Sequence, residues 1–215
     1  MRLGIFVMFF LMACLGHAAV PADTLTASKV FADMPLDVLE LLRPSTRLDM
    51  LDYYNQADSI LTATDALGGR SRLVDVTDDY LKVEVTPVST LEIRLLSGAP
   101  LFMTLYTVGG EGVVKDTEIR FFDSAYTEIP VEDCISAPTL GDFFNLKGSE
   151  IKYSELKEML PFTTIEYTTG PGDAPLTATF TALETLSDEN KERLRPLLTG
   201  PLVLRWNNKR FRMGK

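Results

Sequence analysis

The sequence predicts an α+β fold with a mainly antiparallel sheet, formed by a meander and C-terminal hairpins, and with helices packed on one face. The first observation is an alternation of apolar and polar residues with period two along 80–122, which is typical of strands with one buried face. The second is a series of apolar residues at helical spacing along 31–59. The third is a strong turn sequence at 169–173 between two threonine-rich runs.

The 31–59 region is expected to form two helices that cover the sheet. Asp33 can cap the first helix, Pro35 suits an early helical position, and Pro44 is expected to end it. A second helix is then expected from about 45 to 59.

The meander is expected to contain a short strand at 73–76 and then strands at 80–86, 90–96, 101–108 and around 118–122. The run 101–108 is apolar almost throughout, so we expect a central strand covered on both faces for part of its length. The charged residues between the apolar ones are expected to form an exposed lattice of opposite charges on one face: Lys82, Glu84, Glu92, Arg94, Glu118 and Arg120. We interpret this face as the solvated side of a scaffold, because neighbouring opposite charges keep Glu84 and Glu92 ionised and unsuited to acid catalysis.

The C-terminal half predicts short helices at 139–144 and 149–160, a hairpin from 162–168 and 176–183, a helix at 189–198, and a final strand pair at 202–206 and 209–213. A linker rich in Pro, Gly and Ser is absent from the sequence. We therefore expect residues 20–215 to form a single α+β domain, with two sub-halves that would meet near 125–140.

The first residues have the features of a signal peptide, expected at 1–19. Arg2 precedes the apolar run 3–13, and Gly16-His17-Ala18 supplies small residues for cleavage. The run is too short for an ordinary membrane span, and no later segment offers one. We expect export, with the periplasm as the location. The alternative is an outer-membrane lipoprotein with a lipid anchor on Cys14, because Leu11-Met12-Ala13-Cys14 is similar to a lipobox.

Cleavage there removes the only histidine, His17. Catalysis by Ser-His-Asp or Cys-His groups and His-ligated zinc are then excluded, and we expect no cofactor and no metal. Cys134 would be the only remaining cysteine, so no intramolecular disulfide is expected, and we interpret it as a small buried residue.

The formal net charge of −9 argues against a nucleic-acid partner, because phosphate binding needs a basic surface. Basic residues cluster only at the C-terminus: Lys209, Arg210, Arg212 and Lys215. Docking of this cluster on an anionic membrane is one interpretation, and a terminal strand pair with outward basic positions is the simpler one.

Two loops at the ends of the meander are candidates for binding. Asp78 and Asp79 form a turn before the strand at 80–86, although aspartates in turns commonly bond their own backbone. Gly109, Gly110 and Gly112 form a glycine-rich loop, but no helix follows that could face a phosphate.

Several segments in order resemble a known family: Phe31–Pro35, Arg47–Asp52, Thr77–Lys82 with Ser89–Glu92, and Asp116–Phe122. They are similar to small exported Bacteroidetes proteins classified only as a domain of unknown function. The resemblance covers roughly the N-terminal half and implies export and a compact domain. It transfers no catalytic residue.

We therefore expect a non-catalytic, exported protein of the cell envelope that binds a protein or a glycan. The alternative is a hydrolase of an envelope polymer that uses carboxylates, with Asp78 and Asp79 as its candidates.

Overall fold

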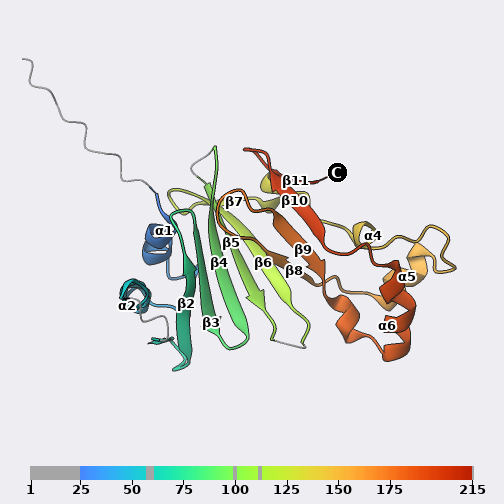
Figure 1. Cartoon of the computed structure of the whole chain (residues 1–215), viewed down its shortest axis with the longest axis horizontal. Coiled ribbons are helices and arrows are strands. Elements are labelled where there is room, and N and C mark those ends of the chain that lie inside the picture. The colour runs from blue at the N-terminus through green and yellow to red at the C-terminus, as the bar shows by residue number, and fades with distance from the viewer. Residues whose placement is uncertain (1–24, 57–60, 99–100, 111–112, 215) are drawn as a thin grey trace, which may run out of the picture.

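The computed structural model describes residues 25–56, 61–98, 101–110 and 113–214, and it contains two antiparallel sheets (Figure 1). The first has seven strands in sequence order: β1 (Ala63–Thr64), β2 (Arg70–Val76), β3 (Tyr80–Thr86), β4 (Ser89–Leu96), β5 (Leu101–Val108), β6 (Asp116–Asp123) and β7 (Glu128–Ile129). The second has the order β11-β10-β9-β8, from β8 (Ile165–Thr168), β9 (Leu176–Phe180), β10 (Leu202–Trp206) and β11 (Phe211–Met213). The predicted α+β class with a mainly antiparallel sheet is confirmed.

Helices α1 (Ala27–Asp33) and α2 (Pro44–Asn55) lie on one face of the seven-stranded sheet (Figure 1). Their bounds differ from those predicted. Thr26 caps α1 by accepting from the Lys29 N–H at 3.2 Å, and α1 ends at Asp33 because the residue before Pro35 takes an extended conformation. The 34–43 segment forms turns rather than a helix, and Pro44 begins α2 instead of ending the preceding helix.

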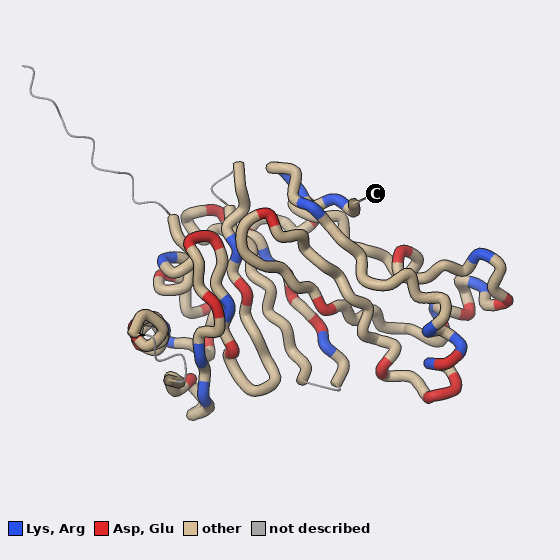
Figure 2. The backbone as a smooth tube through the Cα atoms, viewed as in Figure 1, with Lys and Arg blue, Asp and Glu red and all other residues tan. Residues whose placement is uncertain are grey.

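The remaining helices belong to the second half of the chain. They are α3 (Val131–Cys134), α4 (Leu140–Phe143), α5 (Tyr153–Met159) and α6 (Asp188–Leu194), with the short 3-10 turns η1 (Ala182–Thr185) and η2 (Arg195–Leu197). Figure 1 shows α4, α5 and α6 at the end of the molecule away from α1 and α2. Along the backbone, Lys and Arg residues are interspersed with Asp and Glu residues in both halves of the chain (Figure 2).

The two faces of the seven-stranded sheet belong to two separate cores. Phe102 and Phe122 stack at 5.2 Å in the core under α1 and α2. Met103 and Leu105, from the same strand as Phe102, lie in the core shared with the second sheet. The prediction that 101–108 is covered on both faces is therefore confirmed. Cys134 is buried in this second core, and burial raises the pKa of its thiol, as expected for a structural cysteine.

The predicted exposed lattice of six charges is wrong in two respects. Glu92 and Arg94 are each only 4% exposed, because the 169–174 turn covers them. Glu118 pairs with Tyr106, which pairs with Leu91, so Glu118 and Arg120 lie on the helix-covered face, opposite to the other four charges. Alternation within one strand identifies two faces, but only the pairing register shows which faces coincide.

Candidate functional site

A pocket of about 280 Å³ opens between residues 34–41 and the helix-covered face of β4, β5 and β6. We call it the 34–41 pocket. Its lining residues are Met34, Asp37, Val38, Leu39, Glu40, Leu41, Leu91, Thr104, Tyr106, Glu118 and Arg120. Met34, Leu39 and Leu91 are buried, whereas Asp37, Glu40 and Glu118 are exposed. The pocket therefore has an apolar floor and an acidic rim.

Thr104 is a polar residue in this floor. It is 4% exposed, and within the described residues its hydroxyl makes no hydrogen bond. Three residues along β5, on the other face, the Thr107 hydroxyl lies 2.7 Å from that of Thr117. Tyr106 in the pocket donates to the Ser89 hydroxyl at 3.3 Å. The Thr104 oxygen is not one of the fully buried unpartnered atoms of the described chain, so it is open to the pocket and available to a bound molecule.

Arg120 enters the pocket with its charge already balanced. Its Nε and Nη2 atoms donate to the two carboxylate oxygens of Glu128 at 3.1 and 2.6 Å, and its guanidinium lies 4.9 Å from the centre of the Phe122 ring. The hydrogen bonds that Arg120 donates to Glu128 raise its pKa, and the charges of Glu128, Glu118 and Asp37 raise it further. Asp37, Glu40 and Glu118 make no ion pair within the described part of the chain, so negative charge is in excess around the opening.

Asp79, predicted as a binding residue, has contacts that join the two sheets. Its Oδ1 accepts from the Thr77 hydroxyl at 3.0 Å and its Oδ2 accepts from the Gly172 N–H at 2.7 Å. Asp78 is exposed, and its backbone carbonyl accepts from the Ala27 N–H at 2.8 Å. A shallower pocket of about 210 Å³ lies beside Asp79 and Gly172.

The predicted glycine loop lies at the opposite end of the meander. The Gly109 N–H donates to the Val88 carbonyl at 2.8 Å, whereas the Asp79 carbonyl accepts from Leu95 near the other end of β4. The length of β4 places the two ends about 25 Å apart. Gly109 has φ 128°, and a Cβ added there would lie 2.4 Å from the Val114 carbonyl oxygen, so this glycine is needed for the backbone path. Gly110 accepts from the Val113 N–H at 3.3 Å, and Gly112 lies outside the described residues, as does Cys14.

The charged and hydroxyl side chains between the sheets hold β8, an edge strand. Every second N–H of an edge strand points away from its partner and needs an acceptor. Ile165 donates to Asp116 at 3.1 Å, Tyr167 donates to Thr117 at 3.0 Å, and Thr169 donates to Glu92 at 3.1 Å. We call Glu92, Asp116 and Thr117 the β8 clamp.

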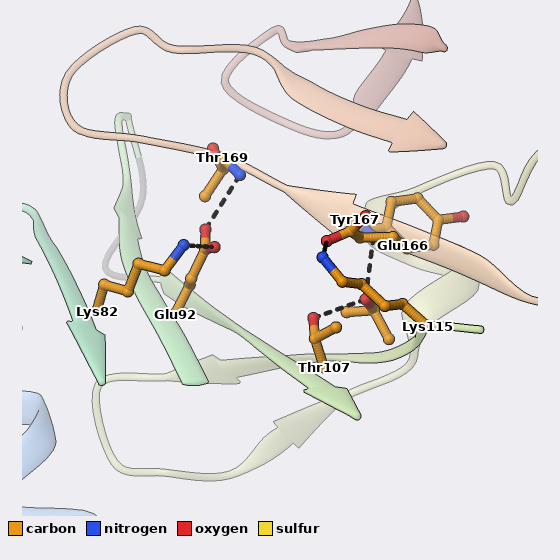
Figure 3. A network of polar contacts seen from close by, with 8 residues as sticks. Lys82, Glu92, Thr107, Lys115, Glu166, Tyr167 and Thr169 are labelled. Carbon is orange, nitrogen blue, oxygen red and sulfur yellow. Dashed lines mark hydrogen bonds and ion pairs between the residues drawn. The ribbon is translucent and has the colours of Figure 1, made fainter. Parts of the chain in front are cut away.

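Further charges support this clamp (Figure 3). Lys82 donates to Glu92 at 3.1 Å, and Lys115 donates to Glu166 at 2.8 Å. Arg94 donates to the Thr169 hydroxyl at 2.7 Å and to the carbonyls of Gly172 and Ala174. These side chains are therefore committed to joining the two sheets.

The sequence patterns did not predict the 34–41 pocket. Thr104, a polar residue inside the apolar run 101–108, was the one signal of it. Residues 34–41 were predicted to be helical, and Glu118 was assigned to the wrong face of the sheet. The prediction therefore did not place these pocket residues near one another. In the part of the chain with described placement, no group of three or more Asp, Glu, Cys or His residues could hold a metal ion, and no helix could span a membrane.

The fold and the pocket define an α+β protein with an antiparallel meander, an apolar and acidic pocket on one face, and a second sheet docked on the other. The chain belongs to the family described as Protein of unknown function (DUF3256), whose model matches residues 19–211. This confirms the resemblance to a family of unknown function. No curated protein matches the chain.

A solved structure is similar to this one: "Structure of a domain of an uncharacterized protein from Porphyromonas gingivalis W83". It has a TM-score of 0.72 and 21% sequence identity, and the match covers 86% of this chain and 98% of that one. At this identity the likeness shows a shared fold.

Proposed function

We propose that this chain is a non-catalytic, exported protein of the cell envelope that binds a protein or glycan partner in the 34–41 pocket. The observation that carries the proposal is the pocket itself, which combines an apolar floor, the unpaired Thr104 hydroxyl and exposed carboxylates. The proposed location, the periplasm or an outer-membrane lipid anchor, is supported by the apolar N-terminal run ending near Cys14.

The hydrolase alternative has less support. The carboxylate of Asp79 accepts from the Thr77 hydroxyl and the Gly172 N–H, and the backbone carbonyl of Asp78 accepts from the Ala27 N–H, so the contacts of both residues serve the fold.

The binding proposal is tested by filling the pocket. Immobilised wild-type protein and the Val38→Trp variant are incubated with envelope extract, and retained proteins and polysaccharide are quantified. Val38 is half-buried in the pocket lining, so the larger side chain should occupy the pocket and remove the specific partner. Val88→Trp, at a position 54% exposed in the turn between β3 and β4, is the matched control. Equal retention by all three proteins would contradict the proposal.

Localisation has its own measurement, the intact mass of the protein recovered from its native host. Cleavage after Ala18 or Ala19 leaves an unmodified chain, whereas an anchored form begins at a lipidated Cys14. A protein that keeps its first residues would contradict export by either route.

A further inference from the structure

We propose that the 34–41 pocket recognises an alkylammonium group, and specifically the side chain of a lysine on a protein partner. This inference rests on the proposed function and names the chemical group that the pocket binds.

The apolar floor matches the stem of such a group. Met34, Leu39 and Leu91 are buried side chains that present hydrocarbon surface to the pocket. A lysine side chain has four methylenes before its charge, and these bury favourably against apolar surface while the charged end reaches polar groups. A small anion or a metal ion would gain no favourable contact with this hydrocarbon surface.

The polar groups of the pocket are acceptors for an ammonium ion. Glu118, Asp37 and Glu40 make no ion pair within 4 Å in the described chain. The one cation of the lining, Arg120, is paired with Glu128 and is close enough to Glu118 and Asp37 for their charges to act on it, so three carboxylates face one shared guanidinium and negative charge remains in excess. An ammonium donates hydrogen bonds and accepts none, so carboxylates and a hydroxyl oxygen satisfy it.

Thr104 provides an observation independent of the charges. Thr104 is 4% exposed and lines the pocket, and its hydroxyl makes no hydrogen bond among the described residues. Its oxygen is not one of the fully buried unpartnered atoms of the described chain, so it is open to the pocket and can accept a hydrogen bond from a bound donor. A donor bound beside Glu118 would satisfy it. The register supports this geometry, because Thr104 pairs with Arg120 and Tyr106 pairs with Glu118, which places the four residues on adjacent positions of one face.

A lysine on a protein is favoured over a free amine or an amino sugar. The carboxylates of Asp37, Glu40 and Glu118 are exposed at the opening, where they can also attract a basic surface around the inserted side chain. An amino sugar would present hydroxyl groups to the floor, which Met34, Leu39 and Leu91 cannot hydrogen-bond.

The experiment uses three small probes of one shape at constant ionic strength: Nα-acetyl-lysine, Nα-acetyl-norleucine and Nα-acetyl-glutamate, all as N-methylamides. Each is titrated into ¹⁵N-labelled protein while amide shifts around the pocket are followed. We expect the lysine probe to bind with a millimolar Kd, about tenfold more tightly than norleucine, and glutamate not to bind. Raising the salt concentration should weaken only the lysine probe.

Variants then separate the contributions. Glu118→Gln should weaken the lysine probe several-fold and leave norleucine unchanged, whereas Glu158→Gln, an exposed carboxylate on α5, should change neither. Thr104→Val should weaken the lysine probe without lowering Tm, because the lost hydroxyl has no partner.

Norleucine binding as tightly as lysine, or Glu118→Gln leaving the lysine affinity intact, would overturn the ammonium inference while leaving the pocket as the binding site. Pocket shifts with glucosamine but not with the lysine probe would overturn the protein-lysine assignment in favour of a glycan. Failure of the proposed function is seen separately, as equal capture by wild-type protein and Val38→Trp.

Discussion

The two faces of the seven-stranded sheet are covered by different kinds of structure, and the residues on each face follow the cover. On one face α1 and α2 bring apolar side chains, and Leu81, Val83 and Ile93 meet them in a dry core. On the other face the second sheet brings the edge strand β8, whose outward N–H groups need acceptors.

This difference explains why the buried charges of the strands lie on the second face. A helix satisfies its interior backbone groups and leaves only those at its ends, which Arg47 bonds at the end of α1, whereas an edge strand presents unbonded donors and carbonyls along its whole length. Asp116 and Thr117 supply these bonds to β8, and Glu92 and Arg94 supply them to the 169–174 turn that follows it. A charged residue in a strand therefore indicates either solvent or a neighbouring backbone.

The largest expected effect tests whether the stability of the face covered by the second sheet depends on its buried charges. Replacing Arg94 by Met leaves the carbonyls of Gly172 and Ala174 without their donor, so we expect the free energy of unfolding to fall by about 3 kcal/mol. Urea denaturation measures it. Arg72→Met, which removes an exposed pair with Glu84 at 2.6 Å, is the control and should cost no more than about 0.5 kcal/mol. Equal losses would mean that burial adds nothing to the Arg94 contacts.

The second prediction tests whether the face covered by α1 and α2 depends less on a buried charge for its stability. Arg47 of α2 is 1% exposed and donates to the carbonyls of Phe31 and Met34 at 2.9 and 2.5 Å, at the C-terminal end of α1. Burial lowers its pKa. Arg47→Met should lower the free energy of unfolding by about 2 kcal/mol, because two carbonyls lose a charged donor. If the free energy of unfolding fell as much as it does for Arg94→Met, both faces of the sheet would depend equally on one buried cation.

The third prediction compares two threonines on opposite faces. Thr117 accepts from the Tyr167 N–H, so Thr117→Val should lower the free energy of unfolding by about 1.5 kcal/mol. Thr104→Val, the same change on the pocket face, should lower it by nothing measurable. Thermal unfolding of the two variants gives the answer, and a larger loss at Thr104 would contradict the assignment of the two faces.

The smallest effect appears at alkaline pH. Burial, followed by the charge of Asp116, raises the pKa of Tyr167 to about 12, whereas an unfolded tyrosine has a pKa near 10. The folded state therefore holds its proton more tightly, and the contribution is complete below pH 10 and is lost as the pH rises towards 12. At pH 11 the expected loss from this residue is about 1 kcal/mol, beyond the loss from other groups. Urea denaturation at pH 8 and pH 11 measures this loss. The free energy of unfolding should differ less between the two pH values for Tyr167→Phe than for the wild-type protein, and an equal difference would show that Tyr167 does not cause the alkaline loss.

Much of the fold followed from local patterns. The strands at 80–86 and 101–108 have the predicted bounds, because the alternation of apolar residues and the intervening turns define them locally. The burial of Cys134 was predicted because neither a second cysteine nor a histidine was expected to accompany it. The first helix was misplaced because Pro35 was interpreted as an early helical residue and Pro44 as the end of the helix. In the structure α1 ends at Asp33, before Pro35, and Pro44 begins α2.

The candidate site followed much less from the sequence. The pocket needs the 34–41 turns to lie over Thr104 and Glu118, about 65 to 85 residues further along the chain, and no local pattern encodes that approach. Asp79 and Gly109 stood out because of their residue types, yet their contacts show backbone and sheet-joining roles.

The sequence by itself determined the class of the fold and the positions of most strands, because these depend on composition and short-range periodicity. The tertiary structure decided which faces of neighbouring strands coincide, which charges are buried and where the pocket lies. A single strand has two faces whatever its partners are, and only pairing and docking choose the surroundings of each face. That choice makes Glu92 a structural acceptor and leaves Glu118 open to a ligand.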